Sequence, residues 1–244
     1  MNWPAKACQP DQNKVSCAPF KSIVLKRIPL VFPGNNTPAA TSRPTAQKIL
    51  IATDVFGMTP AVATLARHFP YACELISPFE GQHFQSEQKA YTHFVANGGV
   101  AAYSEKIAEQ LRSGQLSGNY LMALGFSAGA SALWALSEQA SWQNCQQMVL
   151  FYGSRIRELR EIQPVCPVRL IFAEKEAAFE PKDLVRDLCQ RGHQAELVRQ
   201  ASHGFMNSYS AGYQAKLYTQ YIDRLLVSLA PPLNCRITPP ALAA

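Results

Sequence analysis

Charged side chains are scarce in this sequence: Asp, Glu, Lys and Arg together make up 16% of its 244 residues. Because 48% of the residues are hydrophobic, the composition excludes a disordered chain and predicts a folded protein with a large core. No run of about 18 apolar residues is present, so no membrane-spanning helix is expected. The first 20 residues also lack the apolar central segment of a secretory signal. We therefore expect a soluble, cytoplasmic protein that does not work in a membrane.

Cysteine pairs of the kind that hold metal ions are missing as well. The seven cysteines are widely spaced, form no Cys-x-x-Cys pair and have no histidine at a ligand spacing. An odd number of scattered thiols favours a reducing compartment over a disulfide framework. We therefore expect no metal site built from these cysteines.

A concentrated basic patch is also lacking, although the net charge is +6. Lys and Arg are scattered along the chain and cluster only in residues 154–161, SRIRELRE, where glutamates interrupt them. Such a mixed stretch favours a solvated surface over a site for a polyanion. We expect no nucleic acid partner; the expected partner is a small-molecule substrate, bound by a monomer or a homodimer.

From residue 48 onward, short apolar runs alternate with segments of helical period. The runs lack strict alternation of apolar and polar residues, as is typical of strands buried on both faces of a parallel sheet. The pattern predicts an α/β fold in which a mostly parallel central sheet is flanked by helices. The predicted strands are 48–53, 71–77, 120–126, 147–153, 167–173 and 195–200, and the predicted helices are 60–68, 101–113, 128–139, 182–191 and 209–229.

One main domain, residues 48–230, is expected between two less regular ends. Residues 1–47 form an N-terminal extension in which the β-like run 22–32 predicts one or two edge strands. Residues 231–244 are predicted to be an irregular tail. The polar and aromatic stretch 80–99 follows a predicted strand, and it is either part of a ligand pocket or a plain surface excursion.

Ser127 stands between two glycines, where an apolar run meets an alanine-rich helical segment. A strand, a Gly-x-Ser-x-Gly turn and a helix form the arrangement that raises a nucleophilic serine above the carboxyl edge of an α/β sheet. Gly125 and Gly129 suit this sharp turn, because a side chain at either position would collide with the neighbouring strand or helix. The alternative is a serine that only caps the following helix.

A nucleophilic serine needs a base and a carboxylate that orients it. His203 follows the last predicted strand, so the fold would return its imidazole to the sheet edge, whereas solvated positions are expected for the other four histidines. The acid is expected after the penultimate strand, where the sequence offers Glu174, Glu176 and Glu180. Glu176 is the first choice, because Glu174 is close to the strand end and Glu180 opens the next helix.

Two backbone N–H groups should stabilise the negative charge that forms on an attacked carbonyl oxygen. One is the N–H of Ala128, directly after Ser127. The other is expected from the loop after the first buried strand, where Val55 is the preferred donor. The neighbouring Asp54 is equally well explained as a turn residue.

Together these segments resemble the dienelactone hydrolase family of α/β hydrolases. The resemblance covers residues 48–229 and rests on the segments DVFGMTP, ISPFEG, GFSAGA, FAEKEAAFEP and SHGF. It implies an α/β-hydrolase fold without a large cap domain, and a serine esterase that cleaves a carboxylic ester or lactone through an acyl-enzyme, without metal or cofactor. The implied catalytic triad consists of the nucleophile Ser127, the base His203 and the acid Glu176.

The chain departs from the family at four positions, one of which is Asp54, where the family has a longer acidic residue. The family's founding enzymes have cysteine in place of Ser127 and aspartate in place of Glu176, and an arginine that holds the substrate carboxylate usually follows the histidine motif, where this chain has Asn207. The alternative function is that of a non-catalytic binding or regulatory protein which keeps the fold but has lost turnover.

Overall fold

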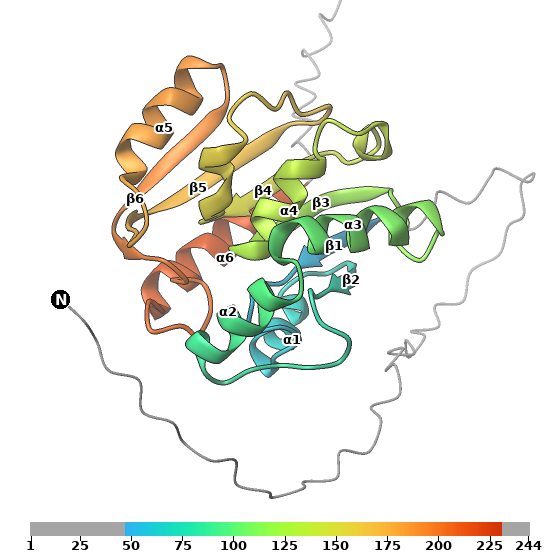
Figure 1. Cartoon of the computed structure of the whole chain (residues 1–244). Helices are drawn as coiled ribbons and strands as arrows, with labels where there is room; N and C mark the ends of the chain where they lie inside the picture. Colours follow the sequence, from blue (N-terminus) through green and yellow to red (C-terminus); the bar gives the residue numbers. More distant parts are fainter. Residues whose placement is uncertain (1–46, 231–244) are drawn as a thin grey trace, which may run out of the picture. The chain divides into compact units, whose positions relative to one another are not determined.

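The computed structural model describes residues 47–230, which fold around one six-stranded sheet (Figure 1). Every pairing between neighbouring strands is parallel, and the strand order is β2-β1-β3-β4-β5-β6. The predicted α/β fold with a parallel central sheet is therefore confirmed. The strands are β1 (Lys48–Ala52), β2 (Ala72–Ile76), β3 (Tyr120–Phe126), β4 (Met148–Phe151), β5 (Val168–Lys175) and β6 (Gln194–Ser202).

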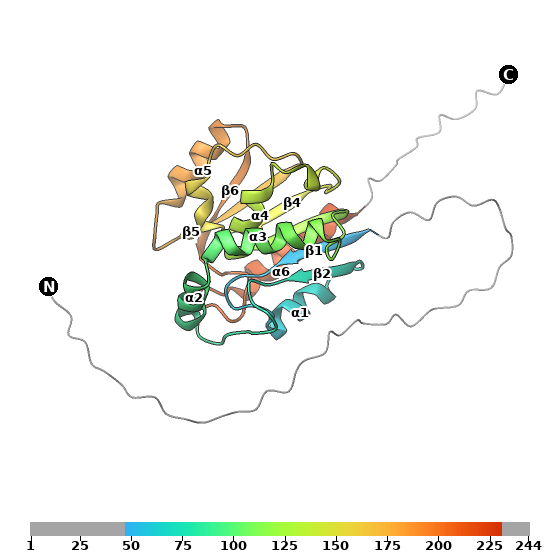
Figure 2. The same cartoon turned by 45° about the vertical axis from the view of Figure 1, so that its right-hand side comes forward.

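Helices cover both faces of the sheet. Figure 2 shows α3 and α4 on one side and α1 and α6 on the other. No helix within the described range is both long and apolar enough to cross a membrane. The helices are α1 (Pro60–Arg67), α2 (Glu87–Ala96), α3 (Gly99–Arg112), α4 (Ala128–Leu136), α5 (Pro181–Gln190) and α6 (Ala215–Leu229), with two 3₁₀ turns, η1 (Ala140–Trp142) and η2 (Ser154–Glu158).

Side chains that alternate along each strand build two separate hydrophobic cores. In β1, Leu50 and Ala52 pack in the core beneath α3, α4 and α5, whereas Ile49 and Ile51 pack in the core beneath α1 and α6. Successive strand side chains point to opposite faces, so a strand covered on both sides must be apolar throughout. Strand β3 is the extreme case, since all seven of its residues are buried.

The predicted pattern of helices needs two corrections. The stretch 80–99 contains a helix that was not predicted, α2, which Ser86 caps by accepting a hydrogen bond from the Lys89 N–H. The last helix was predicted from residue 209, which is wrong: it begins at Ala215. Residues 204–214 form turns instead, and Asn207 contributes to them because its Oδ1 accepts a hydrogen bond from the N–H two residues later.

The order of the strands positions the site. The chain passes from β1 to β2 on one side and then to β3 on the other, so the loops after β1 and β3 diverge at the carboxyl edge of the sheet. Ligands of open parallel sheets bind in the crevice at such a point. The β-like run 22–32, the extension 1–46 and the tail 231–244 lie outside the described residues.

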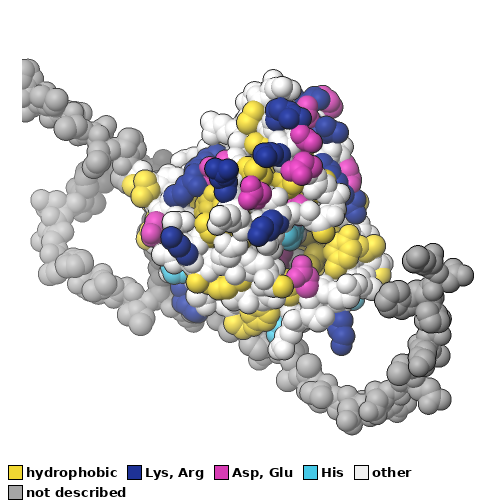
Figure 3. All heavy atoms as spheres, turned by 90° about the vertical axis from the view of Figure 1, so that its left-hand side faces the viewer, with side chains coloured by type: hydrophobic (Ala, Val, Ile, Leu, Met, Phe, Trp, Pro, Cys, Tyr) yellow, Lys and Arg dark blue, Asp and Glu magenta, His cyan; other side chains and the backbone are white. Residues whose placement is uncertain are grey.

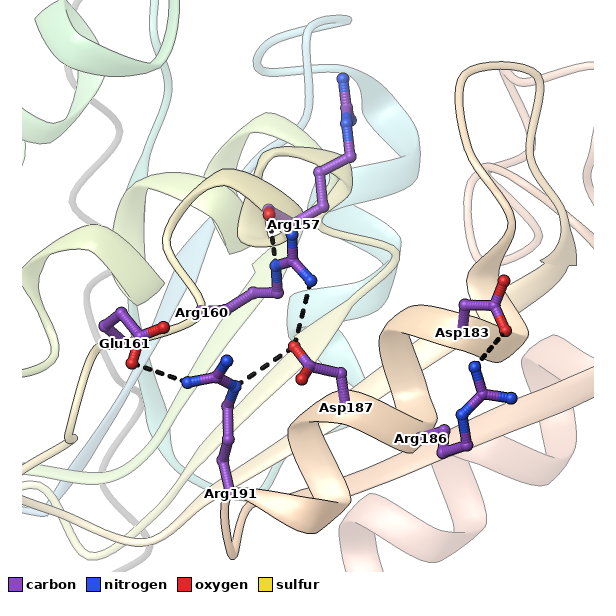
Figure 4. A network of polar contacts seen from close by, with 7 residues as sticks. All are labelled: Arg157, Arg160, Glu161, Asp183, Arg186, Asp187 and Arg191. Carbon is purple, nitrogen blue, oxygen red and sulfur yellow. Dashed lines mark hydrogen bonds and ion pairs between the residues drawn. The ribbon is translucent and has the colours of Figure 1, made fainter.

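The arginine-rich stretch 154–161 lies beside acidic residues (Figure 4). Arg160 Nη1 lies 3.2 Å from Asp187 Oδ2 on α5. Arg191 binds the same carboxylate at 3.2 Å and also Glu161 at 2.6 Å. Figure 3 likewise shows side chains of both signs interspersed on one face of the molecule. These pairs agree with a solvated surface of mixed charge, while the absence of a nucleic acid partner stays a prediction.

Candidate active site

Ser127 lies in the sharp turn between β3 and α4. Its backbone has φ 49° and ψ −105°, a strained conformation for a residue other than glycine. The Ser127 N–H donates a hydrogen bond to the carbonyl of Phe151 at the end of β4, with an N–O distance of 2.9 Å, which helps to hold the turn. Its side chain makes no capping hydrogen bond to α4. The alternative role as a helix cap therefore does not fit the observed geometry.

Both glycines of the turn stand where a side chain has no room. A Cβ atom at position 125 would lie 2.6 Å from the Cα of Ala130. A Cβ atom at position 129 would collide with the carbonyl group of Ala52 at the end of β1. Gly125 and Gly129 thus let α4 start directly against the strands, which brings Ser127 to the edge of the sheet.

Three of the predicted side chains form one hydrogen-bonded series. Ser127 Oγ lies 2.8 Å from His203 Nε2, and His203 Nδ1 lies 2.8 Å from Glu176 Oε1 and 3.0 Å from its Oε2. An ionised carboxylate can only accept, so the Nδ1–H donates to it and Nε2 is left to accept the serine proton. The side chain of Glu176 is 5% exposed and that of His203 is 28% exposed, so the imidazole is accessible from the solvent and the carboxylate is not.

The two other candidate acids are engaged elsewhere. Glu174 Oε2 accepts a hydrogen bond from the backbone N–H of Gln200, at 2.7 Å. Glu180 is the N-cap of α5 and accepts from the Lys182 N–H at 3.4 Å. Of the three glutamates, Glu176 is the one that contacts the imidazole.

The end of β6 and the following turn hold His203. Its backbone N–H donates to the carbonyl of Lys175 at 3.2 Å, which links it to the loop that carries Glu176. Its ring packs against the buried Tyr152, with 5.0 Å between the ring centroids. Three contacts thus hold the imidazole in position: the hydrogen bond of the His203 backbone, the packing against Tyr152 and the hydrogen bond between Nδ1 and Glu176.

The two predicted oxyanion donors lie on the walls of the same cavity as Ser127. Val55 follows β1 and Ala128 is the first residue of α4. Within residues 47–230, neither backbone N–H has a hydrogen-bond acceptor. An N–H at a helix start has no acceptor within the helix, and it therefore suits a developing negative charge.

Asp54 and Asn207 form a buried pair that the sequence did not predict. Asn207 Nδ2 donates to Asp54 Oδ2 at 2.6 Å, and the N–H of Phe56 donates to Oδ1 at 3.0 Å. Burial nevertheless raises the pKa of Asp54 from 3.8 to about 6, because the loss of solvent outweighs both hydrogen bonds. The pair joins the Val55 loop to the turn after His203. The two residues are 153 positions apart, and no local motif connects them.

A cavity of about 980 Å³ opens beside these groups. Helix α2, the start of α3, η2 and the loop after β5 line it, together with Ser127, His203 and Glu176. Part of the stretch 80–99 therefore lines this cavity, while its role in binding a ligand stays a prediction.

Among the histidines of residues 47–230, His203 is the one that hydrogen-bonds to Ser127, while the backbone of His83 pairs with Gly57. His68 packs against Tyr218, His93 against Phe79 and Phe84, and His193 against Trp134. Within residues 47–230, no group of three or more His, Cys, Asp or Glu side chains is arranged to hold a metal ion.

Known proteins share the fold of this chain, and one shares its sequence at a low level. No protein-family model matches the chain. The uncharacterized protein YczH of Bacillus subtilis strain 168 is 27% identical over 178 residues, which cover 70% of this chain and 86% of YczH.

Solved structures of hydrolases superpose on most of the chain. A proposed dienelactone hydrolase from Klebsiella pneumoniae has a TM-score of 0.59 at 15% identity, covering 79% of this chain and 89% of its own. A dienelactone hydrolase-like promiscuous phosphotriesterase, P91, from metagenomic libraries has a TM-score of 0.56 at 12% identity, covering 76% of this chain and 87% of its own. A cold-adapted esterase from an Arctic intertidal metagenomic library has a TM-score of 0.52 at 13% identity, covering 78% of this chain and 85% of its own. The fold is that of the α/β hydrolases.

Proposed function

We propose that this chain is a serine hydrolase, similar to the dienelactone hydrolases, that cleaves a carboxylic ester or lactone through an acyl-enzyme intermediate. The observation that carries the proposal is the hydrogen-bonded series from Ser127 through His203 to Glu176 at the wall of an open cavity. A serine, an imidazole and a carboxylate in this order form the arrangement that activates an alcohol as a nucleophile. The strained backbone of Ser127 supports the same role.

Each step has a group in place to perform it. His203 Nε2 takes the proton as Ser127 Oγ attacks the carbonyl carbon, and the N–H groups of Val55 and Ala128 stabilise the oxyanion. The C–O bond to the leaving alcohol then breaks, and the imidazolium gives its proton to that alcohol. A water molecule, deprotonated by His203, then attacks the acyl carbon. The C–O bond to Ser127 Oγ breaks, and the imidazolium returns its proton to that oxygen, which releases the acid and the free serine. Glu176 orients the imidazole and stabilises its cation.

Alanine in place of Ser127 tests the nucleophile. Ser127→Ala should lose all hydrolysis of p-nitrophenyl acetate while its far-UV and near-UV circular dichroism stay those of the unaltered protein. A fluorophosphonate probe should label the unaltered protein at pH 8 and leave Ser127→Ala unlabelled. Retained hydrolysis by the variant would contradict the assignment. Failure of the unaltered protein to label or to hydrolyse any ester would favour the non-catalytic alternative.

A matched pair of glutamate variants tests the acid. Glu176→Gln keeps the size of the side chain but no longer stabilises the imidazolium, so kcat should fall by a factor of about 10³ to 10⁴. Glu174→Gln alters a glutamate two residues earlier that contacts a backbone N–H and not the imidazole, so it should keep kcat within about threefold. Equal losses in both variants would mean that Glu176 acts only through the structure of the loop.

A further inference from the structure

The cavity beside Ser127 is larger than a short ester requires. Its volume of about 980 Å³ is at the upper end of the range for pockets that enclose drug-sized ligands. Helix α2 forms one wall, and η2 with the following Leu159 forms another. A substrate that fills this space needs a large group next to the scissile carbonyl.

Large apolar side chains face this cavity and remain exposed. On α2, Tyr91, Phe94 and Val95 all line it, as the spacing of three and four residues in a helix allows. Tyr91 is 48% exposed and Val95 53%, and Leu159 on the η2 side is 38% exposed. These are three of the six large hydrophobic residues that are exposed in residues 47–230. Apolar side chains gathered at a site and left in water indicate an apolar ligand.

The charges on the lining do not favour an anionic ligand. Arg155 is the sole Lys or Arg on the described part of the cavity wall, and its Nη1 lies 2.6 Å from Glu158 Oε1. This carboxylate, also part of the wall, raises the pKa of Arg155 above its ordinary value and offsets its charge. Glu87 and Glu176 add further negative charge. A carboxylate on the substrate would therefore meet a wall with more acids than cations.

We propose that the site takes neutral esters that carry a large apolar group, an aryl or medium-length alkyl chain, packed against Tyr91, Val95 and Leu159. The inference rests on the proposed function, because it takes the carbonyl of that ester to lie at Ser127. It assigns α2 and the segment after η2 as the elements that determine substrate specificity.

A series of p-nitrophenyl esters tests the preference for an apolar group. From acetate to hexanoate, kcat/KM should rise by a factor of about 10 or more, since each fully buried methylene contributes a factor of about 4. The p-nitrophenyl hemisuccinate, which carries a carboxylate, should fall below the butyrate by about fivefold or more. A flat or falling series, or a hemisuccinate as good as the butyrate, would overturn the inference.

Failure of this inference is distinguishable from failure of the proposed function. Turnover of the acetate without a rise along the series contradicts the apolar subsite alone. No turnover of any ester, together with no fluorophosphonate label on Ser127, contradicts the hydrolase itself.

Polar substitution on the cavity wall tests the contact directly. Val95→Ser is a change on an exposed helix face, and it should lower the ratio of hexanoate to acetate kcat/KM by about threefold or more. Val227→Ser is the matched control, since Val227 is 74% exposed on α6 and does not line the cavity. The control should leave the ratio unchanged. An unchanged ratio in Val95→Ser would contradict the proposed contact between α2 and the substrate.

Removal of the acidic partner of Arg155 tests the charge argument. Glu158→Gln leaves the guanidinium without its 2.6 Å partner, so the ratio of hemisuccinate to butyrate kcat/KM should rise by about fivefold. Glu161→Gln is the control, because Glu161 pairs with Arg191 and does not line the cavity. Equal ratios in the unaltered protein and Glu158→Gln would mean that the pair does not set the preference.

Discussion

Asparagine in place of Asp54 isolates the contribution of one buried carboxyl group to stability. Burial raises the pKa of Asp54 from 3.8 to about 6 in the folded protein. Between these two values the folded chain binds more protons at this site than the unfolded chain does. The free energy of unfolding therefore falls as the pH rises through this window, and it levels off above pH 6.

The size of the effect follows from the shift. A shift of the pKa from 3.8 to about 6 changes the free energy of unfolding by about 2 kcal/mol between pH 4 and pH 7, because at pH 4 the carboxyl of the unfolded chain is already more than half ionised. Asparagine at this position does not titrate, so Asp54→Asn lacks this dependence. Relative to the variant, the unaltered protein should become less stable by about 2 kcal/mol as the pH rises across that interval.

Urea denaturation at a series of pH values measures the difference. The comparison between the two proteins cancels the titration of the other carboxylates, and any change in the hydrogen bond to Asn207 adds an offset that hardly varies with pH. Asp223→Asn, which removes a carboxyl group at an exposed position of α6, is the control. If the stability difference between the unaltered protein and Asp54→Asn stays constant across the series, burial does not raise the pKa of Asp54 and the reasoning fails.

Three further substitutions test how the site is supported. Gly129→Ala places a Cβ against the carbonyl of Ala52, and it should lower the free energy of unfolding by about 1 to 3 kcal/mol in urea; unchanged stability would show that α4 can shift freely. Trp134→Phe removes the 2.8 Å hydrogen bond from Nε1 to the carbonyl of Leu159, so stability should fall by about 1 to 2 kcal/mol. Because Leu159 lines the cavity, the same variant should raise KM for p-nitrophenyl hexanoate more than for the acetate. Equal changes in the two KM values would contradict a contact between Leu159 and the substrate. Ser131→Ala breaks the link between α4 and η2, and calorimetry should show a loss of about 1 to 2 kcal/mol, whereas no loss would mean that water replaces the hydroxyl.

The sequence predicted elements well where burial alone decides the structure. Strand β3 was predicted with its observed bounds, because its seven apolar residues are buried on both faces and end at the serine turn. Helix α2 was missed because its sequence has little apolar periodicity: only Ala90 and Phe94 of its ten residues are buried. The start of α6 was placed too early because the side chains of Asn207 and Ser210 accept hydrogen bonds from backbone N–H groups two residues later, which keeps the residues before α6 in turns.

Within the candidate site, local motifs were informative and distant pairings were not. The elbow glycines and the position of His203 after the last strand follow from order along the chain. The choice among three glutamates required the path of the loop after β5, where Glu176 reaches the imidazole. The contact between Asp54 and Asn207 depends on two loops that meet across the sheet edge, which no spacing in the sequence encodes.

The backbone angles at position 127 suit glycine better than any residue with a side chain. Ser127→Gly should therefore make the protein more stable by about 1 kcal/mol while removing its hydroxyl. Selection for thermal resistance alone would favour that replacement, which is a change of one residue. A serine at this position thus weakens the fold slightly, and that cost is the one that the nucleophile proposed for Ser127 requires.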